Sequence, residues 1–134
     1  MKRETLLKRD IETNKKFAWK LQSELVRKQS DGICFTCFKH FGWRNLDCGH
    51  CVHSGVSGNW LLDHDERNLR AQCVGCNQYR SGNLSVYINR LEGIYGYGVL
   101  QELLELKHKL YMPTNEEVVD KILELKELLK EFPE

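Results

Sequence analysis

The chain of 134 residues lacks any apolar run close to the roughly 20 residues that a membrane-spanning helix needs. Its first residues, MKRETLLKRDIETNKK, are charged throughout and lack the apolar segment of a secretory signal. Proline is also scarce, since the chain holds only Pro113 and Pro133, both near its end. We therefore expect a cytoplasmic protein whose thiols stay reduced.

Cysteine, by contrast, is well represented, with six residues in three Cys-x-x-Cys pairs. In a reducing compartment this pattern indicates metal binding or redox catalysis rather than a disulfide framework. Two such turns brought together supply the four thiolates that usually close a structural zinc site. The outer pairs therefore predict one bound Zn²⁺, with four ligands: Cys34, Cys37, Cys73 and Cys76.

The middle pair, Cys48-Gly49-His50-Cys51, reads like the redox pair of a thiol oxidoreductase. A redox dithiol needs a helix N-terminus and a cis-proline beside it, whereas both prolines lie far away in the sequence. The negative charge of Asp47 would also oppose a thiolate at Cys48. The redox interpretation remains as the weaker alternative. A second metal bound by Cys48, Cys51 and a histidine is a further one.

A different chemistry follows from His50 and the two asparagines after it, Asn68 and Asn77. An imidazole titrates near neutral pH and can activate water as a general base. An asparagine oxygen suits a hard cation such as Mg²⁺ or Mn²⁺, which can bind a scissile phosphate. A central asparagine can orient the imidazole and hold the loop. This order of residues is the pattern of an HNH, or ββα-metal, nuclease.

The segments DERNLRAQCVGCNQYRSGN and YINRLEGIYG resemble the phage NinG/Rap recombination nucleases over about residues 33–106. The whole layout is more distantly similar to phage T4 endonuclease VII, a resolvase of four-way DNA junctions. The resemblance implies a Mg²⁺-dependent endonuclease for branched DNA that works in the host cytoplasm. It also implies that His50 is the general base, Asn68 the orienting asparagine and Asn77 a ligand of the catalytic metal.

One position departs from the family pattern. HNH sites often carry Asp or His directly before the base histidine, and this chain has Gly49 there. Glu66 and Asp65 are the first candidates for the missing carboxylate ligand. Asp47 ranks after them, because Asp47 and His50 would point to opposite faces of an extended strand. Gly49 also leaves open a non-catalytic, zinc-dependent DNA-binding module.

Charge divides the chain unevenly. Residues 1–30 carry a net charge of +5, whereas residues 91–134 carry −5. The basic segment has apolar residues at helical spacing over residues 4–29, so we expect an amphipathic helix that meets DNA phosphates. The acidic segment predicts leucine-rich helices over residues 99–111 and 114–132. Their apolar faces are either core or the interface of a homodimer.

These observations predict an α+β protein with three parts. A basic N-terminal helix spans residues 1–30, and a zinc-braced HNH nuclease module spans residues 31–82. A helical C-terminal extension, whose apolar faces are candidates for the dimer interface, spans residues 83–134.

Overall fold

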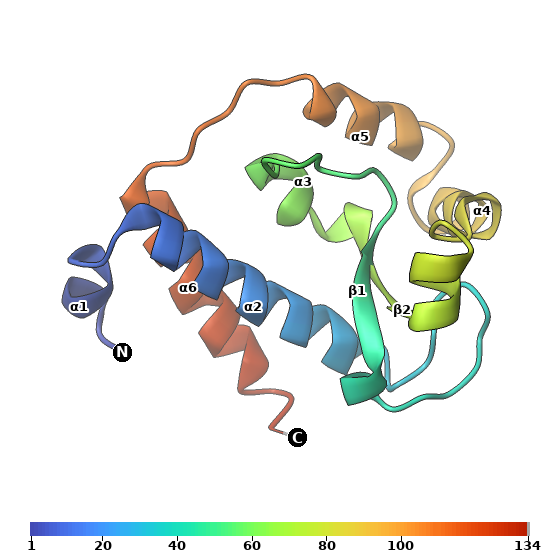
Figure 1. Cartoon of the computed structure of the whole chain (residues 1–134), viewed down its shortest axis with the longest axis horizontal. Helices are drawn as coiled ribbons and strands as arrows, with labels where there is room; N and C mark the ends of the chain where they lie inside the picture. Colours follow the sequence, from blue (N-terminus) through green and yellow to red (C-terminus); the bar gives the residue numbers. More distant parts are fainter. Residues whose placement is uncertain (134) are drawn as a thin grey trace.

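A two-stranded sheet lies between two groups of helices in the computed structural model, which describes residues 1–133 (Figure 1). The expected C-terminal extension is therefore described except for Glu134, which lies outside these residues. The elements are α1 (Arg3–Leu7), α2 (Ile11–Gln29), η1 (Trp43–Asn45), β1 (Leu46–His50), α3 (Trp60–Asp63), η2 (Glu66–Asn68), β2 (Leu69–Cys73), η3 (Gly75–Tyr79), α4 (Leu84–Tyr95), α5 (Val99–Lys107) and α6 (Asn115–Leu129). The fold is thus mixed α+β, and within residues 1–133 no helix is both long and apolar enough to cross a membrane.

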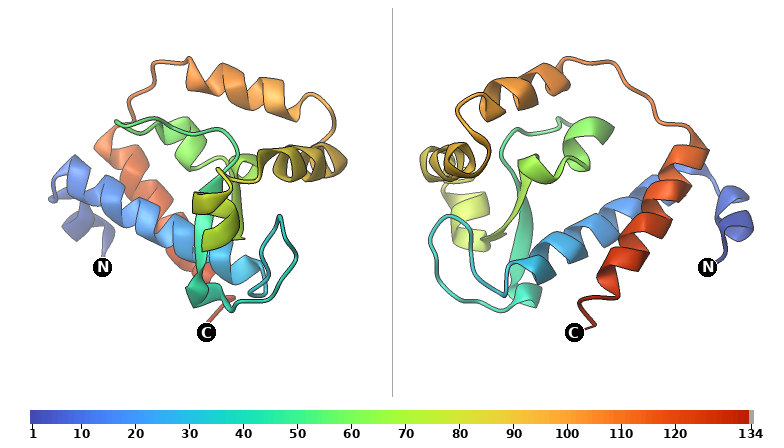
Figure 2. Two further views of the ribbon diagram at one scale, coloured as in Figure 1. Left: turned by 45° about the vertical axis from the view of Figure 1, so that its right-hand side comes forward. Right: turned by 180° about the vertical axis from the view of Figure 1, so that it is seen from behind.

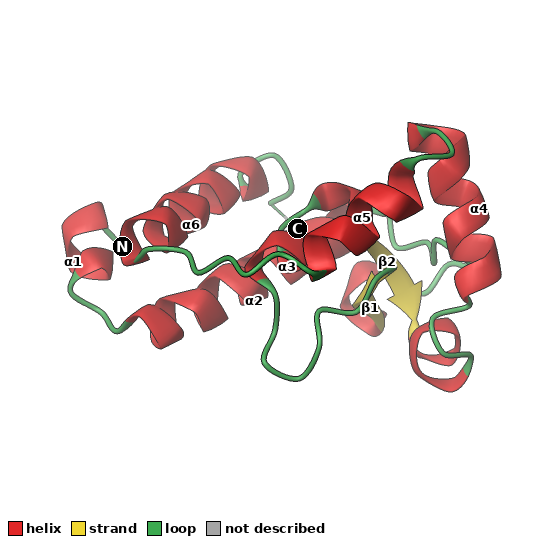
Figure 3. Cartoon of the chain, turned by 90° about the horizontal axis from the view of Figure 1, so that it is seen from above, coloured by secondary structure: helices red, strands yellow, loops and turns green. Residues whose placement is uncertain are grey.

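The strands β1 and β2 pair in antiparallel register, with Asp47 opposite Gln72, Gly49 opposite Arg70 and His50 opposite Leu69. Side chains alternate between the two faces of a strand. His50 therefore lies on the face of β1 that meets α2, whereas Asp47 and Gly49 face η3 and α4. Figure 3 shows the α2–α6 pair and α4 on either side of this sheet.

The helices α2 and α6 pack side by side and form the larger apolar core (Figures 1 and 2). Its buried side chains are Leu6, Ala18, Leu21, Leu25, Val118, Val119, Ile122 and Leu125. Each is at most 9% exposed, so the apolar face of α6 is core within one chain. Of the two alternatives for this face, the packing against α2 favours core, and a homodimer stays a prediction.

The expected single helix over residues 4–29 is broken between Leu7 and Ile11. The backbone carbonyls of Leu7 and Arg9 each accept a hydrogen bond from Nδ2 of Asn115, at 3.2 and 3.3 Å. Asn14 donates in turn to the carbonyl of Leu6 and to Oδ1 of Asn115. Asparagines from α2 and α6 thus satisfy the carbonyls that the end of a helix leaves unpaired.

The C-terminal helices end earlier than their patterns predict. Helix α5 ends at Lys107 and α6 at Leu129. As expected for the start of α6, the side chain of Thr114 accepts a hydrogen bond from the backbone N–H of Glu117 at 3.2 Å. Helix α4 is tied to the sheet by Tyr87, whose hydroxyl donates to the carbonyl of Gly49 at 2.7 Å.

Candidate functional site

The four cysteines of the outer pairs converge on one point. Cys34 and Cys37 lie in the turn after α2, Cys73 ends β2, and Cys76 lies in η3. Their sulfur atoms all lie within 4.8 Å of one another, and Cys37 Sγ is 3.8 Å from Cys73 Sγ. A tetrahedral zinc ion with bonds of about 2.3 Å places its sulfur ligands about 3.8 Å apart. These cysteines could therefore hold a zinc ion, as the spacing predicts.

The middle cysteine pair lies outside this cluster. Cys48 is part of β1 rather than the start of a helix. Burial raises the pKa of the Cys48 thiol to about 12 and that of Cys51 to about 11, so both thiols stay protonated at neutral pH. Because a redox dithiol depends on a thiolate, this environment disfavours the redox alternative. Within residues 1–133, no group of potential metal ligands includes either thiol.

His50 closes β1 and makes a contact that the sequence analysis does not foresee. Its Nε2 atom lies 2.9 Å from Oδ1 of Asp63, with the two side chains 16% and 24% exposed. The imidazole stacks on Trp19 of α2, with ring centroids 5.1 Å apart and planes 20° apart. His53 stacks 6.5 Å away. The ring of His50 is therefore fixed both by its neighbours and by a carboxylate.

Asp63 stays ionised in this setting. Burial opposes ionisation, but hydrogen bonds from His50 and Ser54 outweigh it and lower the pKa of the carboxyl below its usual value. Asp63 ends the short helix α3. Asn59 caps the start of this helix, because its side chain accepts a hydrogen bond from the N–H of Leu62 at 3.1 Å. The sequence indicates only that a helix begins after Asn59. This pattern does not predict a contact between Asp63 and His50.

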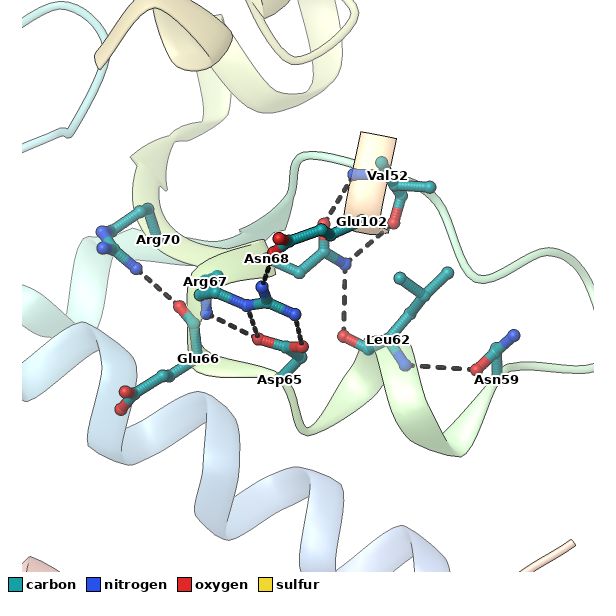
Figure 4. A network of polar contacts seen from close by, with 9 residues as sticks. All are labelled: Val52, Asn59, Leu62, Asp65, Glu66, Arg67, Asn68, Arg70 and Glu102. Carbon is teal, nitrogen blue, oxygen red and sulfur yellow. Dashed lines mark hydrogen bonds and ion pairs between the residues drawn. The ribbon is translucent and has the colours of Figure 1, made fainter. Parts of the chain in front are cut away.

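Asn68 holds the loop after His50 through bonds to Val52 and Leu62 (Figure 4), and its side chain makes no hydrogen bond to the imidazole within residues 1–133. Its side chain accepts from the N–H of Val52 at 2.7 Å and donates to the carbonyls of Val52 and Leu62. Asn68 is fully buried, so these bonds are shielded from water. The loop-holding role expected of Asn68 matches this placement, whereas the contact that orients the imidazole comes from Asp63.

The two carboxylates ranked first as metal ligands are placed elsewhere. Asp65 begins η2, where it accepts hydrogen bonds from the N–H and the guanidinium of Arg67. Glu66 is exposed, and Figure 4 shows its carboxylate pointing away from Asn68. Neither carboxylate forms a hydrogen bond with Asn77 within residues 1–133, and their role as metal ligands stays a prediction.

Asp47 is the carboxylate beside Asn77. Nδ2 of Asn77 donates to Oδ2 of Asp47 at 3.0 Å, and Nε2 of Gln78 donates to the same oxygen at 3.0 Å. Asp47 and His50 do lie on opposite faces of β1, as strand alternation predicts. Asn77, however, lies against the same face of β1 as Asp47. Strand alternation therefore places the Asp47 carboxylate next to Asn77.

Gly49 lies at the centre of this oxygen-rich face. A Cβ atom on Gly49 would lie 1.9 Å from Oε1 of Gln72 and 3.1 Å from Oδ1 of Asn77. Oε1 of Gln72 is buried and has no hydrogen-bond partner within residues 1–133. A side chain at position 49 would therefore clash with Gln72, which fills the space that it would need.

The family model described as "Bacteriophage Lambda NinG protein" matches residues 2–134. Among curated proteins, the chain is similar to "Protein ninG" of Salmonella phage P22, with 39% identity over 71 residues, which are 53% of this chain and 34% of that protein. "Protein ninG" of Escherichia phage 933W is 38% identical over 71 residues, with the same coverage of 53% and 34%. The chain thus spans about a third of the length of these relatives. No solved structure matches it. The chain belongs to the bacteriophage NinG family.

Proposed function

We propose that this protein is a metal-dependent DNA endonuclease with a zinc-braced HNH, or ββα-metal, module that cuts branched DNA during phage recombination. The observation that carries the proposal is the pair of His50 and Asp63, 2.9 Å apart at the end of a strand. A histidine held by a carboxylate is the usual arrangement of a general base. The cysteine cluster supports the strands on which the pair depends.

The protonation states of the pair suit water activation. Because Asp63 is ionised, it accepts a hydrogen bond from Nε2–H of His50, which leaves the lone pair on Nδ1. Nδ1 makes no hydrogen bond within the described part of the chain and can accept a proton from water. The negative charge of Asp63 then stabilises the imidazolium that forms.

The catalytic cation, Mg²⁺ or Mn²⁺, fits the oxygen donors on the other face of β1. Asp47 and Asn77 would hold it, because carboxylate and amide oxygens are the donors that hard cations prefer. Bound there, the cation would supply positive charge for the phosphates of the DNA substrate. The cut would leave a 3′-hydroxyl and a 5′-phosphate, which is an implication of the family resemblance.

Positive charge near the strands supports DNA as the substrate. Around the ring of Trp43, Arg27 lies 5.1 Å, Lys28 4.9 Å and Arg44 4.5 Å from the centroid. The first two come from the end of α2 and the third from η1, directly before β1. Lys28 is largely buried and paired with Glu24, whereas the guanidinium groups of Arg27 and Arg44 can contact the phosphates of a DNA backbone at the start of β1.

The test compares four-way junction, flap and linear duplex DNA, each with and without Mg²⁺, using the full chain. His50→Ala should lower cleavage about 10²–10⁴-fold, the usual contribution of a general base, while DNA binding is retained. His108→Ala is the control, because His108 is exposed at the end of α5. Cleavage by His50→Ala at the wild-type rate would contradict the proposal. Binding without any cleavage by wild type would favour the non-catalytic DNA-binding module.

A further inference from the structure

Three aromatic rings and two guanidinium groups alternate along one side of the sheet. Arg90 lies 5.0 Å from the ring of Phe38 and 4.0 Å from that of Phe35. Arg70 lies 5.2 Å from the ring of Phe35 and 5.5 Å from that of Tyr95. We call these five residues the aromatic–arginine ladder. It joins the first cysteine turn to β2 and α4.

The two arginines of the ladder have no carboxylate partner within residues 1–133. Arg70 donates to the carbonyls of Glu66 and Leu69 and to the hydroxyl of Tyr95. Arg90 donates to the carbonyl of Phe35. Arg67, in contrast, forms ion pairs with Asp65 and Glu102. The ladder therefore carries two positive charges that an anionic ligand can neutralise.

The ends of the ladder are open to solvent. Phe38 is 60% exposed and Tyr95 is 40% exposed. Phe38 also has a φ angle of 68°, in the left-handed region that a glycine adopts at less cost. Burial of the ring does little to offset the free-energy cost of this conformation, because Phe38 is mostly exposed. An exposed aromatic ring on a strained backbone points to a ligand-binding role for that ring.

The ladder borders a groove and approaches the candidate active site. The groove has a volume of about 800 Å³, with Phe35, Arg70 and Tyr95 among its lining residues. Arg70 is the register partner of Gly49, the residue directly before His50. A nucleic acid that lies along the ladder therefore reaches the face of the sheet that carries Gly49, Asp47 and Asn77.

We propose that the aromatic–arginine ladder binds unpaired nucleotides of DNA next to the bond that is cut, which deepens the proposed function and rests on it. Unpaired bases stack on aromatic rings and guanidinium planes, and arginines also neutralise the phosphates between them. In an intact duplex the base faces are already stacked and cannot reach the rings. The ladder therefore selects DNA that has an unpaired segment at the branch.

The test measures binding by fluorescence anisotropy, with the full chain and no added divalent cation. The probes are a short labelled oligothymidine and a duplex of the same number of phosphates. Phe38→Gly and Tyr95→Ala should each weaken oligothymidine binding by at least about fivefold, because one base loses its stacking partner. Phe38→Gly also removes the left-handed strain, so unfolding does not explain its loss of binding. Duplex binding should change less than about twofold, since the phosphate contacts remain.

Tyr97→Ala is the matched control, because Tyr97 is 89% exposed, follows Tyr95 by two residues and makes no ring contact within residues 1–133. Unchanged oligothymidine binding in Phe38→Gly and Tyr95→Ala would overturn the inference, and so would an equal loss of duplex binding. Because these assays do not require cleavage, they separate the inference from the proposed function. If the protein cuts DNA but the ladder substitutions do not change oligothymidine binding, the proposed nuclease function stands and the ladder inference does not. If the substitutions weaken oligothymidine binding but the protein does not cut DNA, the ladder inference stands and the proposed nuclease function does not.

Discussion

Nε2 of His50 lies 2.9 Å from Oδ1 of Asp63, although thirteen positions separate the two residues in the sequence. The intervening loop is closed by Asn68, which bonds to Val52 just after β1 and to Leu62 just before Asp63. A buried asparagine therefore sets the distance between a histidine and its carboxylate without a hydrogen bond to either side chain in the described part of the chain. This arrangement gives Asn68 a positioning role in the proposed nuclease.

Asp63→Asn should lower cleavage by about ten- to a hundredfold, because an amide can donate to the imidazole and hold it in the wrong tautomer. DNA binding and zinc content should stay at wild-type levels. Asp31→Asn is the control, since Asp31 is exposed and has a φ angle of 56°, which asparagine tolerates. Single-turnover cleavage measures the effect, and a wild-type rate for Asp63→Asn would contradict the pairing of Asp63 with the base.

The lowered pKa of Asp63 also predicts how stability depends on pH. Its contribution is present above the unfolded pKa of about 3.8 and is lost as the pH falls through the lower, folded pKa. Urea unfolding of wild type and Asp63→Asn at a series of pH values measures it. The stability difference between them should shrink as the pH falls below about 4. Protonation of the zinc ligands affects both proteins and cancels in the comparison. A constant difference would mean that Asp63 is not ionised in the folded state.

Zinc removal should unfold the region around the sheet. The cysteines connect the first turn, β2 and η3, and the free energy of metal binding is folding free energy in such small modules. Cys73→Ser should therefore lose both zinc, measured by elemental analysis, and its cooperative thermal transition. The double substitution of Cys48 and Cys51 by Ala should keep about one zinc per chain, because neither thiol lies in the cluster. Zinc loss in that double variant would show that the ligands are assigned wrongly.

The cysteine cluster could be predicted because its chemistry is local. A Cys-x-x-Cys turn presents two thiols whatever the rest of the chain does, so the spacing alone predicts all four cysteines of the cluster. Asp63 could not be predicted in this way. Its contact with His50 depends on the path of a loop and on a buried asparagine, and no short motif encodes either. The leucine pattern of α6 likewise predicts that its apolar face is buried. It does not identify α2 as the helix that covers this face.

Asp47 shows a different limit. Strand alternation holds in β1, since Asp47 and His50 lie on opposite faces of the strand. The sequence did not reveal that Asn77 approaches the face of Asp47, because that depends on how η3 folds back over the sheet. Strand alternation alone therefore does not show that Asp47 lies next to Asn77.

Gly49→Ala should destabilise the protein by about 1–3 kcal/mol, the usual cost of overpacking a well-packed site. The new methyl group would meet Oε1 of Gln72 at 1.9 Å. Gln72 cannot turn away freely, because its amide donates to Thr36 and to the carbonyl of Gly82. Gly93→Ala is the control, as nothing lies within 4 Å of a Cβ atom at that helical position. Urea unfolding measures both, and equal stability of Gly49→Ala and wild type would contradict the steric explanation for Gly49.

Ile122→Ala should destabilise the folded chain by about 2–5 kcal/mol, because Ile122 is fully buried between α6 and α2 and its truncation leaves a cavity. Leu128→Ala, in the same helix but 39% exposed at that position, should cost much less. Urea unfolding should be repeated at a low and a high protein concentration. If this face is core, the loss caused by Ile122→Ala is the same at both concentrations. If the face joined two chains, the wild-type midpoint would rise with concentration and Ile122→Ala would abolish that rise. The second result would show that the apolar face of α6 is a dimer interface and would contradict its packing against α2.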